Sequence, residues 1–204
     1  MVSEMFKKLI GLIVLILLVF SGFYVYRMHE NVKHVMSYEV EVEKSLKAQG
    51  LSGDTKLALA IIYTETKGKQ VDIMQSSESL NGTTNTFSTE QESIKQGISN
   101  LSKVLEYASQ KKVDAWAGVQ AYNYGKAYVD YIAAHGGKNT IALSKDYSRD
   151  VVAPSLGNTT GETYYHLTLD SLIYNKGKLY SNGGNIFYAK EVEWNMLLLD
   201  LLNW

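Results

Sequence analysis

Cysteine is absent from this chain of 204 residues, and proline occurs once, at position 154. The lack of cysteine excludes disulfides, thiolate zinc sites and every hydrolase with a cysteine nucleophile. The histidines show no pair at metal-ligand spacing, and we expect neither a metal nor another cofactor. They are His29, His34, His135 and His166. A single proline suits a chain that consists mainly of helices.

A surplus of charge of either sign is also absent. The chain has 20 Lys and Arg residues against 21 Asp and Glu residues, which gives a formal net charge of -1. Proteins that bind nucleic acid usually carry a basic surplus, so nucleic acid is excluded as the main partner. Hydrophobic residues make up 46% and charged residues 20% of the chain, a composition that is typical of globular proteins and not of disordered ones.

One long apolar run lies near the N-terminus. Residues 9–26 contain no charge, and at ~1.5 Å per residue a helix there spans roughly 27 Å, close to the hydrocarbon thickness of a bilayer. Lys7 and Lys8 precede the run and favour a cytoplasmic location for residues 1–8, although basic residues follow it as well. The alternative is a cleaved signal peptide, but the run is long and no A-x-A-like site follows it. The pattern predicts an uncleaved signal anchor in the cell membrane, with the rest of the chain outside.

Residues 27–51 are polar and mostly helix-forming, and they carry a thin apolar stripe. This pattern predicts either a stalk or the first helix of a domain, with Gly50 as its end and the next helix starting at residues 52–54. The stripe consists of Val32, Met36, Val40 and Leu46.

The remaining chain, 52–204, shows mainly helical patterns. Thr89 and Glu92 form a capping box before a helix that runs to Gln110. Further helices are expected over 55–64, 114–125, 127–134, 140–152 (ended by Pro154) and 185–202, with loops over 67–88 and 155–184 and a short hairpin near 175–177.

Glu65 follows an apolar helix, and Ile61 and Ile62 lie on the same helical face as this carboxyl. Burial among such residues disfavours the charged form, and the negative end of the helix dipole acts in the same direction. A carboxyl that holds its proton near neutral pH is what a glycosidase requires as general acid. The alternative interpretation is an exposed glutamate at the end of a helix.

Asp72 lies seven residues further on, beyond the polar turn 67–69. Glycosidases commonly use two carboxylates in different environments. A polar, solvated loop would keep Asp72 ionised while Glu65 keeps its proton. The alternative is an aspartate that only caps the turn.

Five pieces of sequence occur in an order that resembles the lysozyme-like muramidases of Gram-positive bacteria. They are Glu65, the segment 72–78 (DIMQSSE), the segment 93–97 (SIKQG), the segment 121–125 (AYNYG) and Tyr188. The resemblance covers about residues 52–200 and is strongest to CwlT-type lysozyme domains, with goose-type lysozymes and soluble lytic transglycosylases more distant. It implies a mainly α, α+β lysozyme-like fold for residues 52–204, after one transmembrane helix.

The resemblance also implies roles for individual residues. Glu65 resembles the catalytic acid of the family and Asp72 its second carboxylate, whereas Thr66 stands where transglycosylases usually have serine. Ser76 and Ser77 are expected to hydrogen-bond N-acetyl and hydroxyl groups, or alternatively to cap a turn. The expected substrate-binding residues are Met74, Gln75, Ser76, Ser77, Tyr122, Asn123 and Tyr188.

The function that the resemblance implies is a membrane-anchored N-acetylmuramidase. Such an enzyme cleaves the β-1,4 bond between N-acetylmuramic acid and N-acetylglucosamine in peptidoglycan. Two alternatives stay open: a lytic transglycosylase that leaves 1,6-anhydro ends, and a non-catalytic wall-binding protein. By analogy with the family, a small anchored muramidase also suits local opening of the wall for a secretion or conjugation apparatus.

Overall fold

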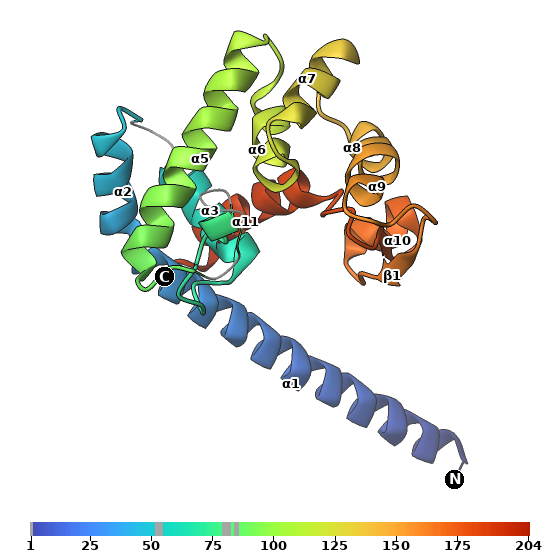
Figure 1. Cartoon of the computed structure of the whole chain (residues 1–204). Helices are drawn as coiled ribbons and strands as arrows, with labels where there is room; N and C mark the ends of the chain where they lie inside the picture. Colours follow the sequence, from blue (N-terminus) through green and yellow to red (C-terminus); the bar gives the residue numbers. More distant parts are fainter. Residues whose placement is uncertain (1, 52–54, 79–82, 84–85) are drawn as a thin grey trace.

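A computed structural model of the chain is mainly helical with little sheet, which confirms the predicted fold class (Figure 1). It describes residues 2–51, 55–78, 83 and 86–204, so the helix start expected at 52–54 lies outside the described residues. The elements are α1 (Val2–Met36), α2 (Glu39–Ala48), α3 (Thr55–Glu65), α5 (Glu90–Gln110), α6 (Ala115–Tyr124), α7 (Ala127–Ala134), α8 (Ile141–Tyr147), the π-helical turn η1 (Ser148–Val152), α9 (Ala153–Ser155), β1 (Thr163–Tyr165), α10 (Leu169–Asn175), β2 (Lys178–Tyr180) and α11 (Tyr188–Leu202).

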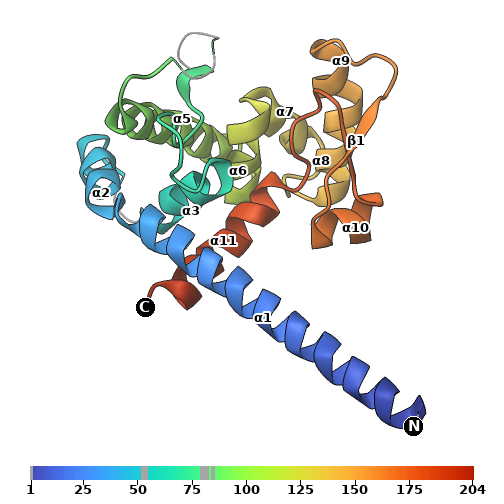
Figure 2. The same cartoon turned by 90° about the horizontal axis from the view of Figure 1, so that it is seen from below.

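Helix α1 begins as an isolated rod and ends inside the domain (Figures 1 and 2). Between Leu9 and Tyr26 each large apolar side chain is at least 45% exposed, so this half of the helix has no covering layer of protein. By length and composition the helix can cross a membrane. Exposure of an apolar surface of this size in water is unfavourable, whereas in a bilayer it is the expected state.

The second half of α1 belongs to the domain. Val32 and Val35 are fully buried, and this part of the helix packs against α3 and α11. The structure therefore selects a first domain helix over a separate stalk. Val40, expected in the apolar stripe, is 77% exposed, because the chain turns between α1 and α2 and interrupts the helical period. The stripe continues instead through Val42 and Leu46, which are buried.

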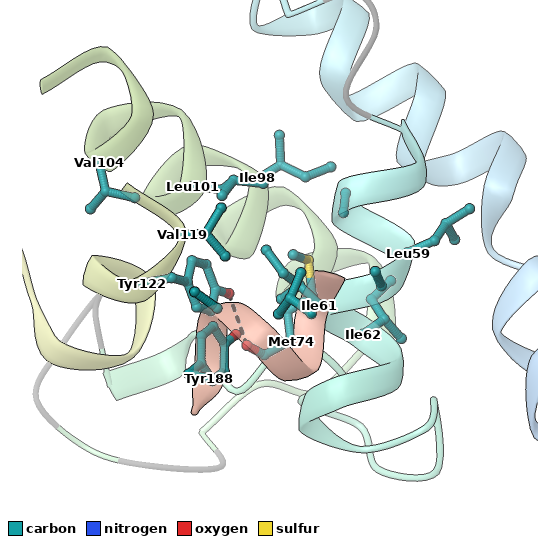
Figure 3. Close-up of a cluster of buried hydrophobic side chains, with 14 of the residues drawn as sticks. Leu59, Ile61, Ile62, Met74, Ile98, Leu101, Val104, Val119, Tyr122 and Tyr188 are labelled. Atoms are coloured by element: carbon teal, nitrogen blue, oxygen red, sulfur yellow. Dashed lines mark hydrogen bonds between the residues drawn. The ribbon is translucent and has the colours of Figure 1, made fainter. Parts of the chain in front are cut away.

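Helix α3 lies at the centre of the domain. Residues 58–63 are all buried, as expected for a helix that is apolar on every side. The helix packs against α1, α2 and α11, while α5 and α6 pack against each other beside it. Figure 3 shows the resulting core, with Ile61 of α3 beside Met74, and Ile98 of α5 and Val119 of α6 on the other side of the cluster.

Helix α5 starts at the predicted capping box, and it contacts the segment around Met74 closely at Gly97. Thr89 and Glu92 form the capping box at its N-terminus. At Gly97 an added Cβ would lie 2.5 Å from the sulfur of Met74, closer than real Cβ contacts. Only glycine therefore lets the segment around Met74 lie directly on α5.

The chain after residue 140 differs in several places from the expected elements. Thr140, the expected first residue of this helix, caps α8, and the helical run continues through η1 and α9 to Ser155, one residue past Pro154. Pro154 thus lies in the last turn of the run, and the chain leaves the helix directly after it, as expected for a residue without an N–H. The final helix begins at Tyr188 and not at Asn185.

A small subdomain occupies part of the expected loop 155–184. Strands β1 and β2 pair antiparallel, with Thr163 opposite Tyr180 and Tyr165 opposite Lys178. The hairpin expected near 175–177 is wrong in detail, because α10 stands between the two strands. A capping box from Thr168 starts this helix, with serine in place of the usual acidic partner, which conceals the pattern in the sequence.

Candidate active site

The carboxyl of Glu65 lies at the last position of α3, on the predicted face. Tyr188 of α11 donates a hydrogen bond of 2.6 Å to its Oε1. Burial raises the pKa of Glu65 from 4.5 to about 7; the bond from Tyr188 opposes this shift, and the negative charges of Asp72 and Glu191 add to it. This group therefore holds a proton close to neutral pH, as the apolar helix predicts.

The carboxylate of Asp72 is buried, with 2% exposure, which corrects the expectation of a solvated loop. Its Oδ1 accepts hydrogen bonds from the Ser76 N–H (2.9 Å) and the Ser93 hydroxyl (2.6 Å), and its Oδ2 accepts one from the Ser77 N–H (3.0 Å). Burial acts to raise the pKa of Asp72, but the hydrogen bonds from these three serines outweigh it and lower the pKa. Protein donors, and not solvent, keep Asp72 ionised.

The turn that holds Asp72 depends on an unusual backbone conformation and on a neighbouring helix. Gln75 has a φ of 47°, in the left-handed region that non-glycine residues rarely adopt. Ser93 of α5 accepts from the Met74 N–H (3.0 Å) while it donates to Asp72. The Ser76 hydroxyl donates to the Ser93 carbonyl (3.0 Å). These hydrogen bonds stabilise the unfavourable backbone conformation at Gln75 and direct the N–H groups of the turn toward the Asp72 carboxylate.

Both carboxylates open into one small polar pocket of about 230 Å³. The hydroxyl of Ser77 is buried beside Asp72 and contributes to the lowered pKa of that carboxyl. The pocket is lined by Glu65, Asp72, Gln75, Ser77, Glu78, Tyr122 and Asn123.

Three expected substrate-binding residues lie behind the pocket and not in its lining. The side chain of Met74 is fully buried against Gly97, and its carbonyl accepts a hydrogen bond of 2.9 Å from Tyr122. Ser76 is buried in the network under Asp72, and Tyr188 is buried behind the acid. These three side chains are directed into the protein, where they hold the pocket residues in position.

Two tyrosines from different helices, Tyr122 of α6 and Tyr188 of α11, stack on each other beside Glu65. The rings of Tyr122 and Tyr188 are nearly parallel, with centroids 6.2 Å apart and an interplanar angle of 7°. Figure 3 shows this pair and the bond from Tyr122 to Met74. The stack joins α6 to α11 at the point where Glu65 ends α3, and it fixes the acid relative to the Asp72 turn.

A buried amide locks α6 to α11 and escaped the sequence analysis. The side chain of Gln120 donates to the Asn185 carbonyl (2.8 Å) and accepts from the Ala189 N–H (3.0 Å). Asn123 accepts from the Asn185 N–H (2.8 Å), and the Asn185 amide donates to Glu191 (2.7 Å). The only sequence signal was a glutamine within an apolar helix, which has no distinctive pattern.

A second cavity of about 430 Å³ extends the pocket past Asn123. It shares four lining residues with the pocket: Gln75, Glu78, Tyr122 and Asn123. It continues beside Tyr147 of α8 and residues 151–156. The two cavities therefore form one elongated cleft, which suits a chain-like ligand better than a small compact one.

The cleft thus combines a proton donor with an ionised carboxylate. Such a pair can protonate a leaving oxygen and stabilise the positive charge that develops beside it. Within the described ranges, no group of three or more His, Asp and Glu side chains is placed to hold a metal ion.

Comparison with known proteins supports the resemblance. Residues 32–196 match the lysozyme-like family. Pneumococcal vaccine antigen A of Streptococcus pneumoniae serotype 4 is 48% identical over 195 residues, which cover 96% of this chain and 95% of that protein. The bifunctional muramidase/DL-endopeptidase CwlT of Bacillus subtilis is 34% identical over 115 residues, which cover 56% of this chain and 34% of CwlT. The crystal structure of a protein similar to NLP/P60-family lipoproteins, from Staphylococcus aureus, matches with a TM-score of 0.72 and 32% identity, covering 80% of this chain and 52% of that one.

Proposed function

This chain belongs to the lysozyme-like family, and from that premise we propose that it is a membrane-anchored N-acetylmuramidase. Its substrate is the glycan strand of peptidoglycan, cut at the β-1,4 bond between N-acetylmuramic acid and N-acetylglucosamine. The observation that carries the proposal is that Glu65 and Asp72 line one pocket in different environments, which raise the pKa of Glu65 and lower that of Asp72. The muramidase named among its relatives supports the choice of substrate.

Glu65 is the general acid in this proposal. Its pKa of about 7 lets it hold a proton at neutral pH and still release it to the glycosidic oxygen as the bond breaks. The bond from Tyr188 holds Oε1 in place, so that the other carboxyl oxygen can carry the proton toward the cleft.

Asp72 stabilises charge in this proposal and does not remove a proton. A carboxylate whose pKa is lowered by three serine donors is a weak base, so it is poorly suited to activate water. Its negative charge, fixed under the pocket, instead favours the positive charge of an oxocarbenium-like transition state.

The weak basicity of Asp72 also favours a second candidate, a lytic transglycosylase. In that reaction Glu65 acts first as acid and then as base, and the C6 hydroxyl of the muramic acid attacks in place of water. No second base is then required. A non-catalytic wall-binding protein remains the third alternative, and the prepared acid in the cleft argues against it.

Mass spectrometry of digested peptidoglycan distinguishes the three functions. The full-length protein is incubated with purified cell walls, with Glu65→Gln as the inactive control. We expect fragments with reducing muramic acid ends, which indicate hydrolysis. Fragments with 1,6-anhydro ends would show transglycosylation, and the absence of released fragments would show a binding protein.

We propose a single-pass topology with residues 1–8 in the cytoplasm, 9–26 in the membrane and the cleft outside the cell. The exposed apolar half of α1 supports the crossing, and Lys7 and Lys8 support the orientation. The domain then starts at about residue 28, where α1 first packs against it. Protease added to intact spheroplasts should degrade the domain, whereas full protection would contradict this topology. An association with a secretion or conjugation apparatus is suggested by family analogy alone.

A further inference from the structure

Helix α10 exposes its apolar side chains and buries a polar one. Leu169, Leu172 and Ile173 lie on one helical face, at spacings of three and four residues, and are 74%, 55% and 64% exposed. The buried residue of this helix is Ser171, whose hydroxyl donates to the carbonyl of His166. A helix at a water-facing surface normally has the opposite arrangement, with its apolar residues inward.

The exposed side chains form one surface, which we call the α10 face. Gly177 lies beneath it, because a Cβ there would lie 3.1 Å from Leu167 and 3.2 Å from Leu172. Contiguous exposed apolar surface marks a site of contact with a protein or a membrane. The α10 face consists of Leu167, Leu169, Leu172 and Ile173, each more than half exposed.

The α10 face lies on the side of the domain toward which the membrane helix runs. In both views the N-terminal end of α1 points to the side that carries α10 (Figures 1 and 2). The helix is continuous from the apolar run into the domain, and His29, three residues after Tyr26, is already buried. Because no flexible spacer separates the two, the domain is held directly at the membrane surface.

We propose that the α10 face rests in the headgroup region of the same bilayer that α1 crosses. Leucine and isoleucine side chains gain from entering the apolar boundary, and the exposed Tyr165 and Tyr174 of the same subdomain are of the type that prefers the interface. Lys176 and Lys178 flank the face and complement anionic lipid headgroups, against a single acidic residue on α10, Asp170. Two attachments, α1 and α10, prevent rotation of the domain about α1 and hold the cleft in one orientation toward the wall.

This inference rests on the proposed membrane crossing by α1, and the test separates the two. The chain contains no cysteine, so single cysteines can be introduced and labelled with an environment-sensitive fluorophore. The positions are Ile173→Cys on the α10 face, Leu17→Cys in the membrane span, and Val40→Cys as a matched control, an exposed apolar residue on α2 away from α10. Each full-length variant is placed in nanodiscs of anionic phospholipid at one copy per disc.

Quenching by lipids that carry a nitroxide gives the result. We expect strong quenching at positions 173 and 17 and none at 40. Quenching at 17 without quenching at 173 would refute the α10 contact and leave the anchor intact. No quenching at either position would refute the anchor as well. Shielding of position 173 from aqueous iodide without lipid quenching would show that protein, and not lipid, covers this face and would also refute the proposal.

A second variant tests whether the apolar side chains cause the contact. Replacing Leu169, Leu172 and Ile173 together with serine changes only exposed side chains, so the fold and the hydrolysis of soluble glycan fragments should be preserved. Full burial of one leucine side chain corresponds to more than about a tenfold change in partition, so the docked population should fall at least about tenfold. A probe at Leu167→Cys should then show the low quenching of position 40. Unchanged quenching would refute the role of these side chains.

Discussion

Replacing Glu65 with glutamine should stabilise the protein at pH 8 and change its stability little at pH 4. The folded protein raises the pKa of this carboxyl from 4.5 to about 7. Between these two values the unfolded chain has lost the proton and the folded chain still holds it, so the free energy of unfolding falls as the pH rises. Because glutamine does not ionise, the free energy of unfolding of the variant does not fall in this way as the pH rises.

The size of the effect follows from the raised pKa. One pKa unit corresponds to about 1.36 kcal/mol, so the advantage of the glutamine variant should grow by about 3 kcal/mol between pH 4 and pH 8. For a chain of this size that growth corresponds to roughly 6–12 °C in Tm. Thermal unfolding of both full-length proteins across this pH range measures it.

Two further results decide whether the reasoning holds. The control Glu106→Gln, on the exposed surface of α5, separates the effect at Glu65 from the general loss of one negative charge. A difference between Glu65→Gln and wild type that does not change with pH would refute the raised pKa. The same substitution should lower the rate of wall digestion by at least about a hundredfold, because the proton donor is lost.

Three other substitutions test the site and its support. Asp72→Asn should lower kcat by about 10²–10³-fold with little change in KM, because it removes the charge that stabilises the transition state, and an unchanged kcat with a lower Tm would make Asp72 structural. Tyr188→Phe removes the bond that lowers the pKa of Glu65, so the alkaline limb of the pH–rate profile should move to higher pH, and a move to lower pH would contradict the geometry. Gly97→Ala should lower the free energy of unfolding by about 1–3 kcal/mol in denaturant titrations, because it crowds Met74, whereas helix propensity alone predicts stabilisation.

Several features of this protein could be predicted from the sequence because they depend on near neighbours. The apolar run of α1, the capping box of Thr89 and the start of a helix at Asp114 all arise within a few residues of chain. The protonated state expected for Glu65 belongs to the same class, since Ile61 and Ile62 lie one turn away on the same helix. Helical periodicity and capping are local, and tertiary packing did not overrule them here.

Other features depend on residues that meet only when the chain folds. Asp72 is ionised because Ser93, 21 residues away, donates to it in a buried network, and no pattern near Asp72 shows this donor. The bond from Tyr188 to Glu65 joins positions 123 residues apart. The orientation of α10 depends on packing as well: residues 155–184 were expected to be a loop, and no pattern near Leu169 shows which side of this helix is covered. Local sequence patterns indicate which side chains share a face of a helix. Packing between segments distant in the sequence decides which of these faces is buried.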